Sequence, residues 1–263
     1  LRGSARRIAS LGRGEAVLLR RNAGALATAL VGPILLVVVP FSNSPDPGRG
    51  AGFDSGSLVV TSLTTFTLIL GVYYNLVTAL VARREESVLK RLRTGEATDP
   101  EIIVGTAAPA IAVSLFQIAI GILTAFILFD MGAPTNPVLV LAAIALGTVV
   151  CVLFASAMTA LATSVEMTQL IATPAMVVSM IFSGVMFPLD LLPEPVQRVA
   201  DGLPLTQVVE LLRLGLTGTP ATGSSEGLAG SFGAALVPAV ILATWVGAGA
   251  WAVRRWFRWE PRR

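Results

Sequence analysis

The sequence predicts an all-α integral membrane protein with six transmembrane helices, and three observations lead to this fold class: composition, long apolar runs and the placement of basic residues. Hydrophobic residues make up 54% of the 263 residues, charged residues make up 13%, and the mean hydropathy is +0.77. A soluble domain of this composition would have too few polar groups to cover its core. We therefore expect one membrane-embedded domain over residues 1–263.

Six apolar runs are long enough to cross a bilayer, for which a helix needs about 20 residues. They are Ala23–Phe41, Leu58–Ala82, Ile102–Phe129, Pro137–Ser164, Thr168–Phe187 and Ser231–Val253. Capping residues mark the start of two of them. Asp99 is expected to cap the third helix ahead of Pro100 and Glu101, and Asn136 to cap the fourth ahead of Pro137. Six crossings place both ends of the chain on the same side.

The basic residues indicate which side this is, because arginine and lysine are retained on the cytoplasmic face. Of the 19 basic residues, only Arg49, Arg198 and Arg213 lie in segments that would face outward. Both termini are therefore predicted to be cytoplasmic. Abundant alanine, glycine and valine, with Lys90 as the one lysine, suggest a bacterial protein and hence the bacterial cytoplasmic membrane.

Several kinds of chemistry are excluded by what the sequence lacks. It has no histidine, and its one cysteine, Cys151, lies in an apolar run, so we expect neither catalytic residues nor a metal site. The GxxxxGK[ST] phosphate loop is also absent, so the chain has no evident means of binding ATP. No nucleic-acid partner is expected.

Two predicted cytoplasmic segments are amphipathic. Residues 1–22 alternate basic and apolar positions and fit either a helix on the inner leaflet or a simple polybasic anchor, because Gly12 and Gly14 weaken the helix. Residues 83–101, RREESVLKRLRTGEATDPE, place Val88, Leu89 and Leu92 on one helical face among charged side chains. This pattern fits a short helix that docks into a partner, or a solvated loop at the lipid headgroups.

The outward segment 188–218 contains apolar stretches that are too short to span a bilayer. Prolines predict two short helices in it, at residues 195–200 and 205–216. We expect re-entrant or interfacial helices between spans five and six, and a cap that seals the outer end of the bundle is the plainer interpretation.

Two of these regions resemble the type-2 permease family of ATP-binding cassette transporters. The stretch SGVMFPLDLLPEPVQRVADGLPLTQVVELLR, from Ser183 to Arg213, is similar to the family's fifth-helix exit and outer re-entrant helices. RREESVLKRLRTGEATDPEIIVG, from Arg83 to Gly105, is similar to its coupling-helix loop, although Thr94 to Ala97 depart from the usual turn. The order and spacing of the six spans match over nearly the whole chain.

The resemblance implies a permease subunit that pairs with itself or a similar permease and is powered by two separate ATPase subunits, which bind the ATP and magnesium. Residues 1–22 would be the connecting helix and 83–101 the coupling loop. Glu85 and Glu86 would pair with charges on the ATPase, while Val88, Leu89 and Leu92 would enter its apolar socket. The outer gate would comprise Phe187, Pro188 and Leu189.

A translocation path is expected along spans two and five, whose hydroxyl, methionine and aromatic side chains suit a lipophilic cargo. The candidate path residues are Thr61, Thr65, Tyr73, Gln169, Thr173, Met176, Met180 and Ser183. The alternative is ordinary helix packing, in which hydroxyls bond within the bundle. Few ionisable residues lie in the spans, and this favours ATP-driven movement of a lipophilic cargo over ion coupling. The resemblance implies that the movement is outward, as export of a drug or lipid-like compound.

Two rival functions stay open at this point. An exporter of a lipid-linked polysaccharide would keep the class but is expected to carry more aromatic side chains than the 6% found here. A membrane scaffold or sensor would dock a soluble partner without transporting anything.

Overall fold

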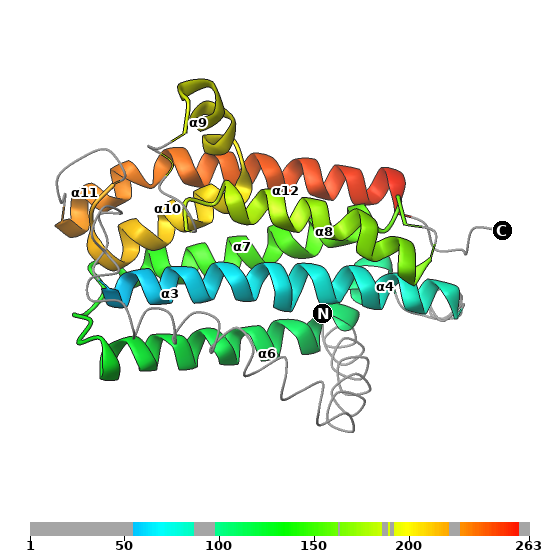
Figure 1. Cartoon of the computed structure of the whole chain (residues 1–263), viewed down its shortest axis with the longest axis horizontal. Helices are drawn as coiled ribbons and strands as arrows, with labels where there is room; N and C mark the ends of the chain where they lie inside the picture. Colours follow the sequence, from blue (N-terminus) through cyan, green and yellow to red (C-terminus); the bar gives the residue numbers. More distant parts are fainter. Residues whose placement is uncertain are drawn as a thin grey trace.

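The computed structural model describes residues 55–86, 98–162, 164–185, 189, 192–220 and 227–257. Over these residues it shows helices and turns, and the long helices lie side by side along the long axis of the molecule (Figure 1). The predicted first span and residues 1–22 lie outside the described part of the chain. The all-α class predicted from the sequence is confirmed for the part described.

One long helix runs from Ser55 to Glu85 and corresponds to the predicted second span. It consists of α3 (Ser55–Phe66), the π-helix η1 (Thr67–Tyr74) and α4 (Asn75–Glu85), which follow one another without a break (Figure 1). A π-helix of this length is uncommon, and such segments are frequently found at functional sites. The apolar pattern of the sequence did not indicate it.

The helix α6 (Asp99–Leu128) corresponds to the predicted third span, with a correction at its start. Thr98, not Asp99, is the N-cap, and it forms a capping box with Glu101, whose Oε2 accepts a hydrogen bond from the Thr98 N–H at 2.9 Å. A threonine followed three residues later by a glutamate satisfies two backbone donors at once. Asp99 therefore occupies the first turn, where its charge also suits the helix dipole.

The helices α7 (Pro137–Met158) and α8 (Val165–Ile181) correspond to the predicted fourth and fifth spans. Asn136 caps α7 as predicted, because its side chain accepts a hydrogen bond from the Leu139 N–H. The predicted boundary at Ser164 is wrong: α7 ends six residues earlier, and Ser164 is instead the N-cap of α8. The end predicted at Phe187 is also wrong, since Gly184 has a φ of +78° and turns the chain after Ile181.

Two short helices follow, as predicted, in the segment between the fifth and sixth spans. The helix α9 (Glu194–Asp201) projects from the bundle, whereas α10 (Pro204–Thr217) packs inside it (Figure 1). With 14 residues, α10 is about 21 Å long and too short to cross the hydrocarbon layer. Ten of its residues are buried, so it fills the bundle interior instead of lying on its surface.

The C-terminal end of α10 is joined to the start of α7. The backbone N–H groups of Thr135 and Asn136 donate to the carbonyls of Leu216 at 3.2 Å and Gly215 at 2.8 Å. These bonds satisfy carbonyls that a helix end leaves without an intrahelical partner. A Cβ on Gly215 would lie 2.8 Å from the Val140 nitrogen, so only glycine permits this close approach.

The last helical segment comprises α11 (Gly227–Ala234) and α12 (Leu236–Trp256), which correspond to the predicted sixth span. The described residues contain four helices long and apolar enough to cross a membrane: Ser55–Glu85, Asp99–Leu128, Pro137–Met158 and Gly227–Trp256. The 17-residue α8 is shorter, at about 26 Å. The predicted count of six spans therefore stays a prediction, although the membrane-spanning character of the chain is confirmed.

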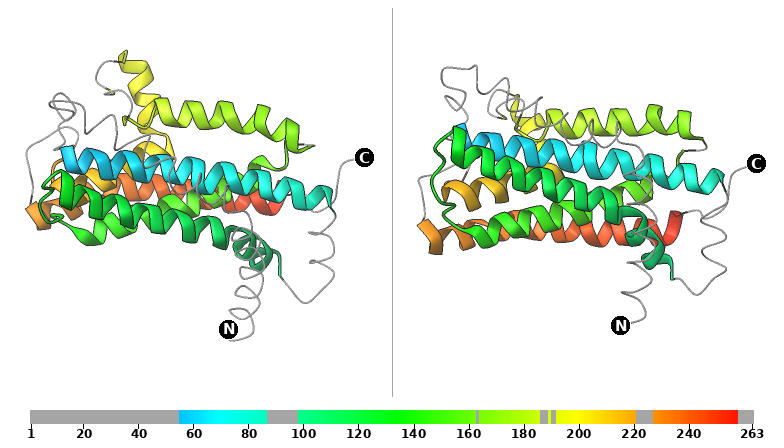
Figure 2. Two further views of the ribbon diagram at one scale, coloured as in Figure 1. Left: turned by 60° about the horizontal axis from the view of Figure 1, so that its bottom comes forward. Right: turned by 90° about the horizontal axis from the view of Figure 1, so that it is seen from below.

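The largest buried cluster lies where α7 contacts η1, α4, α10 and α12. The helix α6 packs on the other side of α3 and η1, and α8 lies along α4 and η1 (Figure 2). The end of α4, the start of α8 and the end of α12 lie at one end of the bundle, and α3 and α11 begin near the other (Figure 1). This arrangement places the ends of α4 and α12, which are both predicted to be cytoplasmic, at the same end of the bundle.

Candidate functional site

The predicted path residues of the second span are buried in the bundle. Thr61, Thr65 and Tyr73 are at most 3% exposed. The Thr65 hydroxyl donates to the Thr61 carbonyl at 2.8 Å, which confirms that these two residues lie on one helical face. This backbone bond is also what hydroxyls do in ordinary helix packing.

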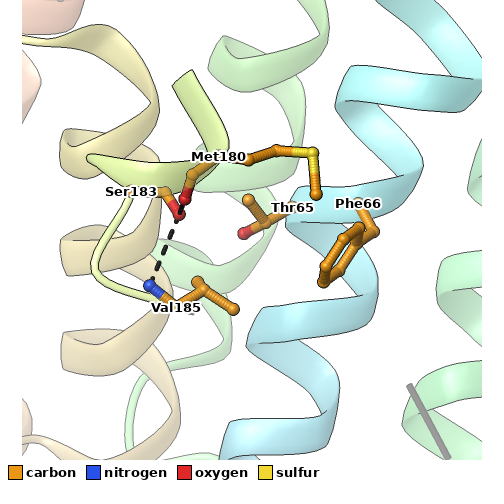
Figure 3. Close-up of a pocket in the computed structure, with 5 residues that line it drawn as sticks. All are labelled: Thr65, Phe66, Met180, Ser183 and Val185. Atoms are coloured by element: carbon orange, nitrogen blue, oxygen red, sulfur yellow. Dashed lines mark hydrogen bonds between the residues drawn. The ribbon is translucent and has the colours of Figure 1, made fainter. Parts of the chain in front are cut away.

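Three of the predicted path residues meet where α3 faces the end of α8. Thr65 and its neighbour Phe66 lie opposite Met180, Ser183 and Val185 (Figure 3). The Ser183 hydroxyl donates to the Met180 carbonyl at 2.7 Å and accepts from the Val185 N–H at 3.4 Å, so it stabilises the turn that ends α8. All five side chains are uncharged, and they leave no room for a solvent molecule between them.

Two others, Tyr73 and Met176, line a larger cavity of about 330 Å³. Its walls come from η1, α7, α8, the start of α10 and α12. The lining residues are Ile69, Tyr73, Val150, Cys151, Phe154, Pro174, Ala175, Met176, Val178, Ser179, Leu203, Pro204, Leu205 and Trp245. The Tyr73 and Phe154 rings stack with centroids 5.3 Å apart, so one wall is aromatic.

Two path residues of the fifth span, Gln169 and Thr173, lie on α8 outside both groups. Gln169 is exposed and Thr173 is half-buried. Of the 17 residues in α8, only Thr168 and Ala172 are buried, so most of this helix is uncovered within one chain. Five of the eight candidates thus lie in these two groups. Thr61 lies one turn before Thr65 on α3, and Gln169 and Thr173 lie on an open helix.

Three consecutive residues at the end of α4 each contact a different helix. Arg83 donates to the Thr106 hydroxyl of α6 at 3.0 Å, and the Glu85 carboxylate accepts from the Val165 N–H, at the start of α8, at 3.3 Å. Between them, Arg84 donates to the carbonyls of Thr159 at 2.7 Å and Ala162 at 2.5 Å, just beyond the end of α7. We call Arg83, Arg84 and Glu85 the α4 junction.

Arg84 is the buried member of the α4 junction, with 2% of its surface exposed. Its guanidinium occupies the C-terminal end of α7, where the helix dipole is negative and carbonyls lack intrahelical partners. A buried charge is tolerated only when such groups compensate it. The position therefore fixes α4, α7 and the connection to α8 relative to one another.

Of the predicted coupling residues, Glu85 belongs to the α4 junction and Glu86 directly follows it. Glu85 and Glu86 are exposed, and Glu85 uses one oxygen for the contact with Val165. Val88, Leu89 and Leu92 lie outside the described residues, as do Phe187 and Pro188 of the predicted outer gate. Leu189 is half-buried, and its side chain lies beside Gly184, 3.4 Å from the position of an added Cβ.

Sequence reasoning missed Arg84 and most of the cavity lining. A signal for Arg84 was present, because Leu76, Leu80 and Arg84 recur every four residues and so share the buried face of α4. The cavity had no comparable signal, since its walls come from five separate segments. In the described ranges no group of three histidine, cysteine, aspartate or glutamate side chains could hold a metal ion.

Comparison with known proteins adds one match. A family model described as "ABC-2 type transporter" matches residues 6–217, which include the second to fifth predicted spans, the α4 junction and both short helices α9 and α10. No curated protein matches the chain.

Proposed function

We propose that this chain, which belongs to the ABC-2 type transporter family and is the membrane-spanning permease subunit of an ABC transporter, exports a lipophilic drug or lipid-like compound. The export is outward across a bacterial cytoplasmic membrane, with both termini in the cytoplasm. Two ATPase subunits and a second permease copy complete the assembly, as a homodimer or with a similar permease. ATP and magnesium are bound by the ATPase subunits.

The proposed chemical class of the cargo rests on one observation, the uncharged contact between α3 and α8. Thr65, Phe66, Met180, Ser183 and Val185 present hydroxyl, thioether, aromatic and alkyl groups, none of which would compensate a charge on a cargo. Methionine and aromatic side chains adapt to apolar molecules of different shape. In this conformation the contact is closed, so the path opens when α3 and α8 separate.

The α4 junction supports a route by which the ATPase subunits cause that separation. The predicted coupling loop, residues 83–101, begins at the end of α4 and ends at the start of α6. A movement of this loop reaches α6 through Arg83, α7 through Arg84 and α8 through Glu85. ATP binding closes the ATPase subunits, and the junction transmits the shift to the helices that line the path.

The test is ATP-dependent transport in proteoliposomes that contain the permease and its co-purified ATPase subunits. An uncharged lipophilic fluorescent dye, added on the ATPase side, is expected to accumulate inside inverted proteoliposomes when ATP is supplied. The double substitution Leu89→Asp with Leu92→Asp is expected to abolish both ATPase association and transport, because charged side chains cannot enter an apolar socket. Arg255→Gln, an exposed change in α12 on the same predicted side, is the control and should leave both intact.

Three outcomes would contradict parts of the proposal. If dye accumulation is the same with and without ATP, the chain is not part of an ATP-driven transporter and the scaffold function is favoured. ATP hydrolysis stimulated by a lipid-linked polysaccharide but never by lipophilic dyes would replace the cargo class. Normal ATPase association in the Leu89, Leu92 double variant would remove the coupling assignment.

A further inference from the structure

The cavity behind α8 lies within a single chain and is open on one side. Its lining residue Val178 is 47% exposed, and Pro174, one turn earlier on the same helix, is also exposed. Cys151, on the opposite wall, is only 5% exposed. The cavity therefore extends from the outer face of α8 inward to α7.

The side chains of the lining offer almost no hydrogen bonds to an occupant. The Tyr73 hydroxyl donates to the Ala172 carbonyl at 3.5 Å, the Ser179 hydroxyl to the Ala175 carbonyl at 2.7 Å, and the Trp245 indole N–H to the Gly202 carbonyl at 2.9 Å. Apart from the weak thiol donor of Cys151, each lining side chain with an N–H or O–H is thus already engaged. A buried water needs two to four polar partners, so a lining of this kind favours an apolar occupant.

The size of the cavity also suits a ligand. An apolar cavity of about 150 Å³ in another protein stays dry and binds benzene. The volume here is about 330 Å³, which lies at the lower end of the range for small-molecule pockets. Leaving such a space empty would cost the lining its dispersion contacts, so filling it is favourable.

We infer that this cavity is a binding site for an uncharged hydrocarbon group, supplied either by the acyl chain of a bilayer lipid or by a free lipophilic compound. Tyr73, Phe154 and Trp245 form aromatic walls, and Met176 is the flexible side chain that adjusts to the occupant. The site goes beyond the proposed function, because binding needs neither ATP nor the ATPase subunits. A failed transport experiment would not contradict binding in the cavity, and a failed binding experiment would not contradict transport.

The test is photolabelling of the full-length permease in lipid vesicles without ATPase subunits. One arm uses a phosphatidylcholine with a diazirine in the middle of an acyl chain, and the other uses a small uncharged aryl diazirine with and without excess biphenyl. Both probes form carbenes that need no reactive side chain, and adducts are mapped by peptide mass spectrometry. Adducts on Cys151 or Phe154 are expected in at least one arm, and in the second arm biphenyl should reduce them about tenfold if it occupies nine-tenths of the sites.

Matched variants separate the cavity from the exposed face of α8. Ala175→Phe fills the cavity and is expected to remove the Cys151 and Phe154 adducts. Val177→Phe adds a ring to the same helix at a residue that is 42% exposed and does not line the cavity, so it should keep them. Ser179→Leu is the second filling variant if Ala175→Phe unfolds, as judged by thermal denaturation in detergent.

The two arms also identify the source of the hydrocarbon. Inner-wall adducts from the phosphatidylcholine probe indicate a lipid chain, and adducts from the aryl probe alone, lost with biphenyl, indicate a free compound. Absence of inner-wall adducts in both arms would overturn the inference. Equal labelling of the Ala175→Phe and Val177→Phe variants would overturn it as well.

Discussion

Gly215 shows how one residue determines the position of a buried helix. Its missing side chain allows α10 to approach α7 until the Asn136 N–H can donate to the Gly215 carbonyl at 2.8 Å. An added Cβ would lie 2.7 Å from the Val140 Cγ2 and 2.8 Å from the Val140 nitrogen. The second of these atoms belongs to the backbone and cannot rotate away.

We therefore predict that Gly215→Ala destabilises the protein by about 1–3 kcal/mol, the usual cost of forcing extra atoms into a packed core. Thermal unfolding of the purified chain in detergent measures this change. The control is Gly247→Ala in α12, where a Cβ would meet nothing within 4 Å. Equal melting temperatures for the two variants would show that the approach of α10 to α7 is not tight.

Helix caps show how well the sequence predicts the role of single residues. Asn136 was predicted as a cap and is one: Thr135 precedes it, but Val138, three residues after Thr135, cannot complete a capping box. At the third span, Thr98 and Asp99 both qualify, and the glutamate three residues after Thr98 decides between them. The error was one residue, and the capping-box pattern was already present in the sequence.

Among the helices, α4 is distinguished by the buried guanidinium of Arg84. We predict that Arg84→Leu lowers ATP-driven transport far more than it lowers ATPase association, because the ATPase contact is expected in the coupling loop and the lost bonds are inside the bundle. Removing the guanidinium leaves the carbonyls of Thr159 and Ala162 without this donor, at a cost of about 1–3 kcal/mol for each buried acceptor.

Two further variants make the Arg84 prediction specific. Arg84→Lys keeps the charge but cannot reach both carbonyls in the same way, so it should restore only part of the transport. Arg254→Gln, at an exposed position of α12, should transport normally. If the Arg84→Leu and Arg254→Gln variants hydrolyse ATP and transport dye equally well, Arg84 has no role in coupling.

The helix α8 carries a prediction about the partner of this chain. Only Thr168 and Ala172 are buried, while Leu170 is 76% exposed and Val177 is 42% exposed. We predict that two permease copies meet along α8. In a Cys151→Ala background, Val177→Cys is expected to give a cross-linked dimer with a short bifunctional maleimide, detected by gel electrophoresis.

The control for this cross-link is Ile127→Cys at the end of α6, a residue that is 70% exposed. It should remain monomeric on the gel, because exposure alone does not bring two copies together. Equal cross-linking at both positions would show that contact is random, and cross-linking at Ile127 alone would move the interface to α6.

For the described spans, the presence of a helix was predictable from apolar runs, but the helix ends and the π-helix were not. The run from Pro137 to Ser164 reads as one span because Thr159 to Thr163 contain no proline or glycine. The helix α7 nevertheless ends at Met158, and a turn follows at Thr159 to Leu161. The segment Thr67–Tyr74 is apolar on nearly all sides, so its sequence does not distinguish a π-helix from an α-helix. In the turn after α7, Arg84 of another helix binds the carbonyls of Thr159 and Ala162, a contact that the local sequence does not indicate.

At the scale of the whole molecule, the arrangement of the basic residues leads to a prediction about orientation. A green fluorescent protein fused to either terminus is expected to fluoresce, and an alkaline phosphatase fused at either terminus is expected to be inactive, because both ends are predicted to be cytoplasmic. A phosphatase inserted after Gly218, at the C-cap of α10, should be active. Reversed activities would invert the topology.

The cavity illustrates what could not be predicted at this scale. Tyr73 and Met176 are predicted path residues of spans two and five, and they do line a common space. Cys151, Phe154 and Trp245, however, come from spans four and six, and nothing in their local sequence indicates that they approach Tyr73. Their proximity depends on how the helices are rotated about their axes.

That rotation depends on the π-helix. Each residue absorbed by its wider turns rotates the helix beyond it by roughly 100°. The phase of α4 relative to α3 is therefore set within Thr67–Tyr74, and it is this phase that directs Arg84 towards the end of α7. Deletion of a single residue from this segment would rotate α4 about its axis while α3, with its many hydroxyl side chains, kept its position. The α4 junction would then no longer face its partners on α6, α7 and α8.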